Sequence, residues 1–379
     1  MFEEIVAFIR NQFGTNEFIP LHAPVFKGNE REYVLETIDS TFVSSVGKFV
    51  NRFEEMICDY TKAKYAVAIV NGTAALHLAL VINEIKPGDL IVTQPLSFIA
   101  TCNAIKYANA DPLFIDIDNS TLSLSAGKLD VYLKENSIQK NKECFHKQTG
   151  RRIRACVPMH TFGLAAEIDA IAEICSDNNI ILIEDAAESL GTLYRGKHTG
   201  TFGDCGTYSF NGNKTITCGG GGMIVTDNAS LAKRAKHLST QAKVTHAWDF
   251  VHDEIGYNYR LPNINAALAC AQLEQIEKFI KAKRLLAGAY KDFFATTSIR
   301  YISEQENSRS NYWLNAILLN DEDERNAFLR YTNENSVMTR PCWRPMHKLD
   351  MFKNNITGDL SNVQWIESRL VNIPSSAII

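Results

Sequence analysis

The sequence predicts an α/β fold in which helices flank a mostly parallel central sheet and a smaller α/β domain follows at the C-terminal end. Three observations support this prediction. The length of 379 residues is enough for two domains. Short and nearly continuous apolar runs, such as Tyr65–Val70 and Asn179–Glu184, recur along the first part of the chain. Helical patterns separate these runs, and this alternation indicates strands that are buried on both faces.

The segment before the first apolar run is expected to be helical with irregular connections. Residues 2–12 are amphipathic and predict a helix. The spacing of Asn29 and Glu32 predicts a capping box for a helix that runs to about Ser40. The remaining expectations for this segment are an irregular stretch at 18–27, a turn at 44–47 and a helix at 48–62.

Strands and helices then alternate. The expected strands are Tyr65–Val70, Leu90–Thr93, Pro112–Ile117, Ala155–Met159, Asn179–Glu184, Gly206–Phe210 and Gly222–Thr226. The expected helices are Ala74–Ile82, Phe98–Tyr107, Glu167–Asp177 and Asn228–Leu238. The densest basic run, Lys140–Arg154, is interpreted as a solvated hairpin in preference to an anion site.

A domain boundary is expected near residues 240–260. Beyond Pro262 the pattern predicts one long helix through about Phe294, followed by a strand at Tyr312–Leu319. We therefore expect an N-terminal segment at 1–44 that packs on the small domain, a large domain at 45–245 and a small C-terminal domain at 246–379.

Composition excludes several classes of protein. Lys plus Arg number 39 and Asp plus Glu number 43, so the net charge is −4 and does not favour nucleic-acid binding. The nine cysteines form no C-x-x-C pair, which indicates reduced thiols in the cytoplasm and no metal site. The N-terminus is interpreted as an amphipathic helix and not as a signal peptide. No run approaches the roughly 18 apolar residues that a membrane span needs.

The strongest chemical candidate is Lys214. It lies in a short polar loop between the predicted strand Gly206–Phe210 and the glycine run 219–222. A lysine that is partly shielded from water can lose its proton and act as a nucleophile or form an imine.

Two further features fall at the carboxyl ends of predicted strands, where ligands gather in such sheets. Gly72, Thr73 and Ala74 begin a helix, and a helix N-terminus favours a phosphate group. The Thr73 hydroxyl either caps that helix or binds the anion, and the cap is the simpler interpretation. Ser209 lies five residues before Lys214 and could reach the same anion.

Asp185 directly follows the apolar run Asn179–Glu184. It either caps the next turn or keeps a heteroaromatic nitrogen protonated. Phe98 is either a core residue or a side chain that lies flat on such a ring. A phosphate site, a carboxylate and a lysine are together what pyridoxal phosphate (PLP) requires. His160 follows a strand and could face the same site, whereas no dinucleotide or P-loop motif is present.

Five segments in order resemble the PLP-dependent sugar aminotransferases of the DegT/DnrJ/EryC1/StrS family. They are NGTAALHLAL (71–80), PLSFIATCNAI (95–105), EDAAESLG (184–191), SFNGNKTITCGGGGMIVT (209–226) and GYNYRLPNINAAL (256–268). The resemblance implies the aspartate-aminotransferase-like PLP fold type I. It also implies a homodimer with active sites at the subunit interface.

The resemblance implies a role for each matching residue. Lys214 forms the imine with PLP and moves the proton, and Asp185 pairs with the pyridine nitrogen. Cofactor-binding positions are Gly72, Thr73, Ala74, Phe98, Glu188, Ser209, Asn211 and, from the partner subunit, Asn258. Glu188 and Asn211 depart from the commoner family residues, and a carboxylate beside the phenolic oxygen is unfavourable unless it is protonated or bridged by water. Substrate-binding candidates are His160, Arg260, Arg340, Trp343 and His347, and surface or core roles stay open for the last three.

The implied reaction moves an amino group from glutamate to C4 of a nucleotide-linked 4-keto-6-deoxy sugar. The segments SFNGNK, SSVG and 136–154 resemble the subgroup that acts on UDP-2-acetamido-2,6-dideoxy-4-keto-hexoses for bacterial surface glycans such as O-antigen or lipopolysaccharide. Three alternatives stay open. They are a dTDP- or GDP-linked keto sugar aminated at C3 or C4, a PLP dehydratase, and a non-catalytic protein that binds PLP or a sugar nucleotide.

Overall fold

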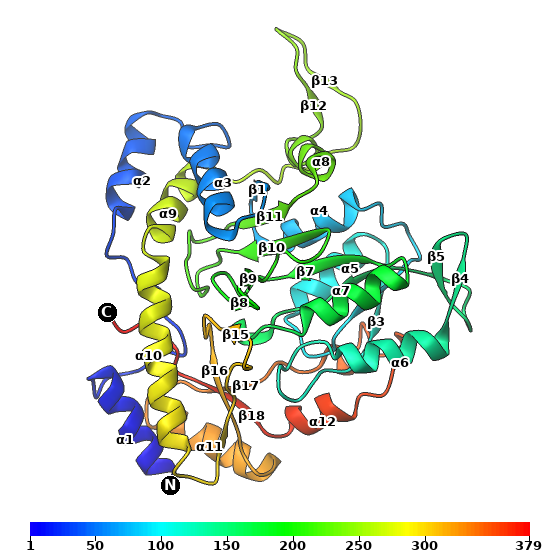
Figure 1. Cartoon of the computed structure of the whole chain (residues 1–379). Coiled ribbons are helices and arrows are strands. Elements are labelled where there is room, and N and C mark those ends of the chain that lie inside the picture. Colours follow the sequence, from blue (N-terminus) through cyan, green and yellow to red (C-terminus); the bar gives the residue numbers. More distant parts are fainter.

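The computed structural model describes residues 1–379 and contains a nine-stranded sheet and a four-stranded sheet, both covered by helices, besides two smaller sheets of two and three strands (Figure 1). The large sheet has nine strands, and seven of them follow the order β1-β11-β10-β7-β6-β2-β3. These strands are β1 (Tyr65–Ile69), β2 (Leu90–Thr93), β3 (Asp111–Phe114), β6 (Arg152–Val157), β7 (Ile181–Asp185), β10 (Cys205–Ser209) and β11 (Gly222–Thr226).

Five consecutive strands of this order, β10, β7, β6, β2 and β3, run parallel to one another. This agrees with the predicted α/β fold. The sheet is nevertheless mixed, because β11 runs antiparallel to both β10 and β1. The loop that carries Lys214 joins β10 directly to β11, and such a direct connection without a crossover helix makes the two strands antiparallel.

Alternate residues of the strands face different groups of helices. Ile91, Ala155 and Ile183 pack against α4 (Gly72–Ile82) and α5 (Ile99–Tyr107). Val92, Cys156 and Leu182 pack against α6 (Ala126–Asn136) and α7 (Ile168–Asp177). Burial on both faces explains why these strands are continuously apolar in sequence.

The remaining helices surround these layers. They are α1 (Phe2–Phe13), α2 (Glu30–Asp39), α3 (Lys48–Thr61), α8 (Ala229–Ser239), α9 (Asn263–Leu273), α10 (Ile276–Phe294), α11 (Glu322–Glu334) and α12 (Ser361–Glu367). No helix of this structure combines the length and the apolar character that crossing a membrane requires.

The predicted long helix after Pro262 is wrong, because the chain forms two helices, α9 and α10, with a break at Glu274 and Gln275. The break allows the two helices to serve different cores. Buried residues of α9, such as Ala266 and Cys270, pack with α3. Tyr290 and Phe294 near the end of α10 pack with the second sheet (Figure 1).

The second sheet is antiparallel and has the order β14-β16-β18-β17. Its strands are β14 (Arg300–Tyr301), β16 (Asn315–Leu318), β17 (Arg340–Pro341) and β18 (Leu370–Ile373). Ile5 and Ile9 of α1 share a core with Ile317 and Val371 of this sheet, so the two ends of the sequence pack together. The domain boundaries at 44 and 245 stay a prediction.

The capping box predicted at Asn29 and Glu32 is wrong. Asn29 occupies the N-cap position of α2, but its side chain makes no capping hydrogen bond. Instead its Nδ2 donates to Glu274 Oε2 at 2.9 Å, so a contact with a distant helix holds the side chain away from the helix end. Glu30 supplies the local contact by accepting from the Gly28 amide at 2.7 Å.

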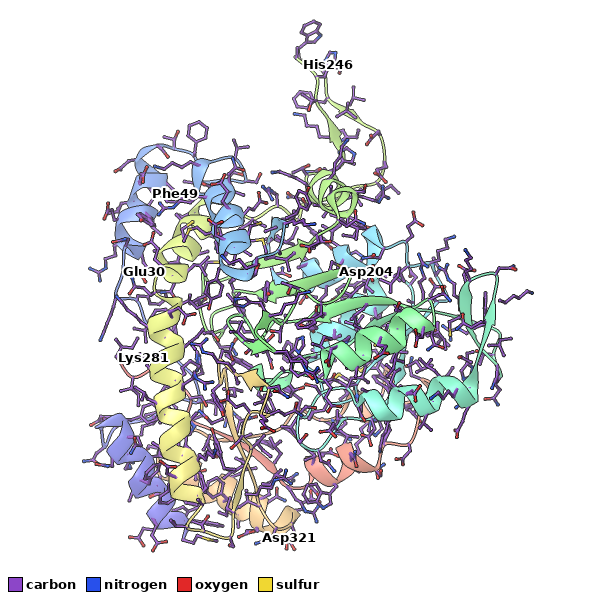
Figure 2. All side chains as sticks on the ribbon, viewed as in Figure 1. Glu30, Phe49, Asp204, His246, Lys281 and Asp321 are labelled. Carbon is purple, nitrogen blue, oxygen red and sulfur yellow. The ribbon has the colours of Figure 1, made fainter.

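Two hairpins project from the body of the molecule (Figure 1). β4 (Ser137–Lys140) and β5 (Glu143–His146) form the hairpin that was expected in the basic run. β12 (Lys243–Val244) and β13 (Val251–His252) form a longer arm, and Figure 2 shows His246 near its tip, far from the body of the molecule. Trp248, Phe250 and Ile255 of this arm are exposed. A third small sheet contains β8 (Leu193–Tyr194), β9 (Lys197–His198) and β15 (Ser308–Arg309).

Candidate functional site

A cavity of about 270 Å³ lies at the carboxyl ends of the parallel strands, where ligands bind in α/β folds. The end of β7 contributes Asp185 and the end of β10 contributes Ser209. The remaining lining comes from the start of α4, the start of α5, the segments after β6 and β7, the Lys214 loop, and the segments that precede β16 and follow β17. It comprises Asn71, Gly72, Thr73, Leu76, Phe98, Ala100, Met159, Ala187, Glu188, Asn211, Asn213, Lys214, Trp313 and Trp343.

The Lys214 amine is held between a carboxylate and an aromatic ring. Its Nζ lies 3.2 Å from Glu188 Oε1 and 4.0 Å from the ring centroid of Trp313. Trp313 also donates from Nε1 to the Asn213 carbonyl at 2.6 Å, which fastens the loop next to the lysine. The Lys214 side chain is only 12% exposed, so its amine is directed into the cavity and not into solvent.

Asp185 is oriented by two hydrogen bonds. Its Oδ2 accepts from the Thr101 hydroxyl at 2.6 Å and its Oδ1 accepts from the Ala187 amide at 3.2 Å. Burial raises the pKa of Asp185, while these hydrogen bonds and the charge of Lys214 act in the opposite direction. A protonated ring nitrogen placed beside this carboxylate would stabilise its charged form further.

Glu188 is the second buried carboxyl group beside the lysine. Its Oε2 accepts from the Phe162 amide at 2.9 Å. Burial raises the pKa of Glu188 to about 7, although Lys214 and this hydrogen bond act in the opposite direction. Glu188 can therefore gain or lose a proton near neutral pH, and this property lessens the conflict expected between a carboxylate and an anionic cofactor oxygen.

The start of α4 differs from the simpler sequence interpretation. Asn71, and not Thr73, caps the helix, because Asn71 Oδ1 accepts from the Ala74 amide at 2.8 Å. The Thr73 hydroxyl makes no hydrogen bond with another protein group and lines the cavity. The Ala74 amide is therefore already hydrogen-bonded. The first amides of a helix otherwise have no partner within the helix, which leaves them available to a ligand. A Cβ atom at Gly72 would lie 2.8 Å from the Ser209 Cβ, so glycine permits the close approach of these two elements.

Phe98 and Trp343 form the outer wall of the cavity. Phe98 is 50% exposed at the start of α5, so its interpretation as a core residue is wrong. Its ring meets that of Trp343 edge-on, with 6.2 Å between the centroids. Trp343 also packs on Phe162, with 4.9 Å between the centroids, and this contact orients it from the small sheet toward Phe98.

The structure does not bring His160 or Arg260 into the cavity. Both ring nitrogens of His160 are paired, Nε2 with Glu184 Oε2 at 3.0 Å and Nδ1 with the Ala166 amide at 3.1 Å. Arg260 is buried, forms an ion pair with Glu54 and donates to the Ala68 carbonyl at 3.1 Å. Their polar groups therefore serve the fold, and the expectation of substrate contact finds no support in these contacts.

The other predicted positions lie outside the cavity within one chain. Asn258 is exposed and pairs with Thr240 next to the projecting arm, which is compatible with a contact to another subunit. Arg340 lines a neighbouring cavity that shares Trp343 with the first. His347 lies in a short 3₁₀ helix, Met346–Lys348, and lines neither cavity.

Sequence reasoning missed Trp313, Asn213 and Thr101. Trp313 lies within the predicted strand 312–319 and resembled an ordinary core residue. Its contact with Lys214 joins residues about 100 positions apart, and no local pattern indicates such a pairing. Thr101 follows Phe98 by one helical turn, and this spacing could have placed it on the cavity side of α5.

The residues of the cavity fit PLP. A shielded amine, a buried carboxylate, a helix N-terminus and a close approach at Gly72 meet in one place. The family model for DegT/DnrJ/EryC1/StrS aminotransferases matches residues 24–378. The chain belongs to this family. It is therefore a PLP-dependent aminotransferase, as the motifs of Lys214 and Asp185 predicted.

Several relatives extend over nearly the whole chain. The GDP-perosamine synthase of Escherichia coli O157:H7 is 36% identical over 364 residues, covering 95% of this chain and 93% of the relative. The putative pyridoxal phosphate-dependent aminotransferase EpsN of Bacillus subtilis is 36% identical over 335 residues, covering 88% and 84%.

Solved structures confirm the fold of this DegT/DnrJ/EryC1/StrS family member. The aminotransferase PseC of Helicobacter pylori has a TM-score of 0.85 at 22% identity and covers 94% of both chains. The PLP form of Spr1654 from Streptococcus pneumoniae has a TM-score of 0.84 at 20% identity, covering 94% of this chain and 93% of the other. The predicted PLP fold type I is thus confirmed.

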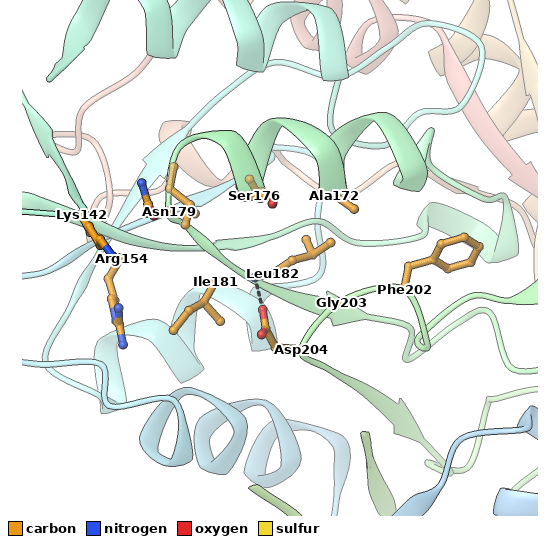
Figure 3. Close-up of a pocket in the computed structure, with 12 residues that line it drawn as sticks. Lys142, Arg154, Ala172, Ser176, Asn179, Ile181, Leu182, Phe202, Gly203 and Asp204 are labelled. Atoms are coloured by element: carbon orange, nitrogen blue, oxygen red, sulfur yellow. Dashed lines mark hydrogen bonds between the residues drawn. The ribbon is translucent and has the colours of Figure 1, made fainter. Parts of the chain in front are cut away.

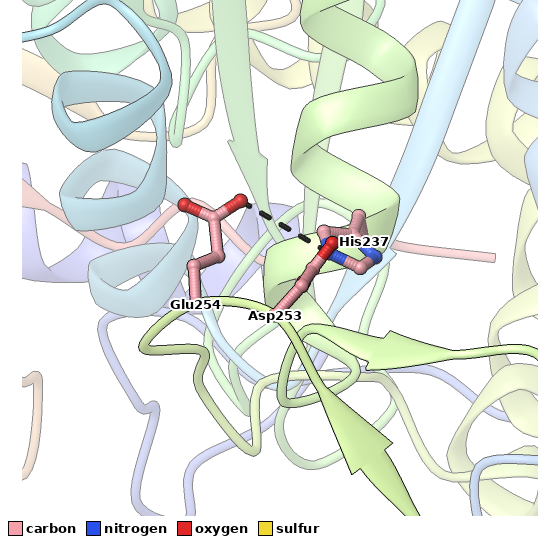
Figure 4. Close-up of side chains that lie close together, drawn as sticks. All are labelled: His237, Asp253 and Glu254. Atoms are coloured by element: carbon pink, nitrogen blue, oxygen red, sulfur yellow. Dashed lines mark hydrogen bonds and ion pairs between the residues drawn. The ribbon is translucent and has the colours of Figure 1, made fainter.

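Two other groups of polar residues lie away from this site. A cavity of about 550 Å³ with Lys142, Arg154 and Asp204 opens at the opposite ends of the parallel strands (Figure 3). At the base of the projecting arm, His237 Nε2 lies 2.7 Å from Asp253 Oδ1 and 4.0 Å from Glu254 Oε1 (Figure 4). Arg234 pairs with Glu254 at 3.1 Å, so this second group is an ion-pair network that supports the arm.

Proposed function

We propose that this aminotransferase moves an amino group from glutamate to C4 of a nucleotide-linked 4-keto-6-deoxy sugar. The observation that carries the proposal is the placement of the Lys214 amine between Glu188 and Trp313, at one end of a cavity that also contains Asp185. The nucleotide-sugar part of the proposal is supported by the GDP-perosamine synthases, which align with this chain over nearly their full length.

Bound PLP supplies a ring that withdraws electrons from the carbon next to the transferred nitrogen. Lys214 binds the cofactor and afterwards moves a proton at the reacting carbon, and general acid–base transfer of this kind contributes about 10²–10⁴-fold. Asp185 keeps the ring nitrogen protonated because Thr101 and Ala187 hold its carboxylate toward the cavity. Glu188 orients the Lys214 amine, which lies 3.2 Å from Glu188 Oε1, and the pKa of about 7 lets the Glu188 carboxyl group gain or lose a proton near neutral pH.

The remaining lining residues hold the cofactor and exclude water. Thr73, Gly72 and Ser209 bind the phosphate group at the start of α4, where the helix dipole favours negative charge. Phe98 packs on the face of the ring, and Trp313 and Trp343 shield the amine from solvent. Asn211 contacts the cofactor from the Lys214 loop, and Asn258 completes the phosphate site from the partner subunit of a homodimer.

The substrate within this class has two candidates. The segments SFNGNK and SSVG favour UDP-2-acetamido-2,6-dideoxy-4-keto-hexose, and such a product serves bacterial surface glycan biosynthesis. The 36% identity to GDP-perosamine synthases favours a GDP-linked keto sugar. The nine cysteines are free thiols, which supports work in the reducing cytoplasm.

A substrate panel tests the proposal. The holoenzyme is offered UDP-, GDP- and dTDP-linked 4-keto-6-deoxy sugars with glutamate, and each product is identified by mass spectrometry and NMR. We expect one nucleotide class to gain an amine at C4 while 2-oxoglutarate forms in equal amount. Amination at C3, loss of water without gain of nitrogen, or no reaction with any nucleotide sugar would contradict the proposal.

A further inference from the structure

A second cavity, of about 490 Å³, adjoins the PLP pocket. The two cavities share Asn213, Trp313 and Trp343, so the same three side chains border both of them. The far wall of the second cavity contains His22 from the segment before α2 and Arg340 from β17. No aspartate or glutamate lines it, whereas the PLP pocket contains both Asp185 and Glu188.

His22 has a nitrogen that lacks a partner. Its Nδ1 is buried and makes no hydrogen bond. The backbone around it is held in place, because the Ala23 amide donates to Ser376 Oγ at 2.8 Å and the Leu21 carbonyl accepts from the Ser375 amide at 2.7 Å. A buried polar atom without a partner in a well-held segment is uncommon, and a ligand is one explanation for it.

Arg340 is the cation that lines this cavity, and it has no acidic partner. Arg340 forms no ion pair and uses only its Nη1, which donates to Asn333 Oδ1 at 3.2 Å and to the Thr339 carbonyl at 3.1 Å. Lys283 is fully buried and donates only to the carbonyls of Trp313 and Ser375. Burial is the main cause of the lowered pKa of His22, and the charges of Lys283 and Lys214 lower it further. Burial also lowers the pKa of Lys283 to about 7.

We propose that this second cavity is an anion subsite in which Arg340 and His22 bind a carboxylate or phosphate group of a substrate whose other end reaches Lys214. This inference rests on the proposed function. The anion is the carboxylate of the amino donor or the diphosphate of the nucleotide sugar. The charge distribution orients either substrate, because the Arg340 guanidinium lines the second cavity and attracts an anion there, while no acidic side chain of that lining opposes it.

Binding of unreactive anions to the holoenzyme tests the subsite without any turnover. Isothermal titration is carried out with glutarate, which has the two carboxylates of glutamate and no amine, and separately with inorganic pyrophosphate. We expect Arg340→Gln to weaken at least one of them about tenfold or more, because a charge-assisted hydrogen bond is lost. His22→Phe, which keeps a ring of similar shape, weakens the same ligand.

Arg330→Gln is the matched control. Arg330 is exposed on the neighbouring helix α11 and forms no ion pair, so its replacement leaves both affinities at the wild-type value. Loss of glutarate binding alone identifies the donor carboxylate, and loss of pyrophosphate binding alone identifies the nucleotide. Equal affinities in the wild type, Arg340→Gln and His22→Phe would overturn the subsite, as would failure of the wild type to bind either anion. Because Arg340 is exposed, we expect Arg340→Gln to fold, so the test stays decisive even if His22→Phe unfolds.

The two proposals fail in different ways. A holoenzyme that binds glutarate through Arg340 but aminates no nucleotide sugar contradicts the proposed function and keeps the subsite. If the holoenzyme aminates a keto sugar but Arg340→Gln binds both anions with wild-type affinity, the subsite is contradicted and the proposed function is kept.

Discussion

At the scale of single residues, the chemistry depends on how Lys214 is surrounded. Its amine has a carboxyl group at 3.2 Å on one side and an indole ring at 4.0 Å on the other. A cation over an aromatic face is stabilised by about 0.5–2 kcal/mol, more when water is excluded. The position of the amine is therefore set before any substrate arrives.

The first residue-scale prediction concerns Lys214 itself. Lys214→Ala removes the group that binds PLP covalently and moves the proton, so we expect loss of the visible absorbance of the bound cofactor and loss of transamination by at least about 10²-fold. Absorbance spectra and the rate of 2-oxoglutarate formation measure the two effects. Lys64→Ala, at an exposed lysine before β1, is the control and should behave as the wild type. Normal transamination by Lys214→Ala would refute the assignment.

Glu188 leads to a prediction about pH. Its pKa rises from an ordinary carboxyl value of 4.5 to about 7 on folding, so the native apoprotein binds more protons than the unfolded chain between these values. Stability from this group is present below pH 4.5 and is lost as the pH rises through 7. We expect Glu188→Gln to become more stable relative to the wild type as the pH increases from 5 to 8, measured as the difference in Tm of the apoproteins. The exposed Glu173→Gln should show no such trend.

At the scale of elements, the start of α4 joins the fold to the cofactor. Two nearby side chains have different roles there. Asn71 closes the helix by accepting from the Ala74 amide, and the Thr73 hydroxyl is left free at the cavity. The sequence NGTA permits either residue to act as the cap, because asparagine and threonine both favour that position.

Because Asn71 and Thr73 have different roles, their substitutions should affect stability and PLP binding in opposite ways. Asn71→Ala removes the cap and should lower the free energy of unfolding of the apoprotein by about 0.5–2 kcal/mol. Thr73→Ala should leave that free energy nearly unchanged but weaken PLP binding, because a phosphate partner is lost. Urea denaturation and PLP titration separate the two effects. A larger stability loss for Thr73→Ala than for Asn71→Ala would show that threonine is the cap.

At the scale of the whole molecule, the cavity depends on the meeting of two sheets. The large sheet supplies Asp185 and Ser209 at its strand ends, and the region of the small sheet supplies Trp313 and Trp343. The projecting arm exposes Trp248, Phe250 and Ile255, and exposed apolar groups of this kind mark an interaction surface. These features favour the predicted homodimer.

Mixing two inactive variants tests the dimer. If Asn258 serves the partner's site, Lys214→Ala and Asn258→Ala should each be impaired alone. A mixed dimer then contains one site with both residues intact, so unfolding and refolding equal amounts together should restore up to about one quarter of wild-type activity. Transamination assays and sedimentation measure the outcome. No recovery in demonstrated mixed dimers would place Asn258 in the site of its own chain or outside both sites.

The predictable part of the fold was the part that local patterns describe. The strand Gly222–Thr226 was predicted with its observed bounds, because a continuous apolar run follows a glycine turn. The break between α9 and α10 was not predicted, because helical sequence continues through Glu274 and Gln275 and only the separate cores of the two helices reveal it. The cap predicted at Asn29 was wrong for a similar reason, because the Asn29 side chain donates to Glu274, which is distant in sequence.

The sequence by itself determined the α/β fold, the family and the residues Lys214 and Asp185, because these follow from short motifs and apolar periodicity. Only the tertiary structure decided which polar groups remain available for a ligand. Arg260 is paired with Glu54, which is 206 residues away, and His160 is paired with Glu184, whereas His22 Nδ1 is left without a partner. Whether a polar atom is paired depends on hydrogen bonds and ion pairs between segments that are distant in sequence. The geometry of these contacts exists only after the chain has folded.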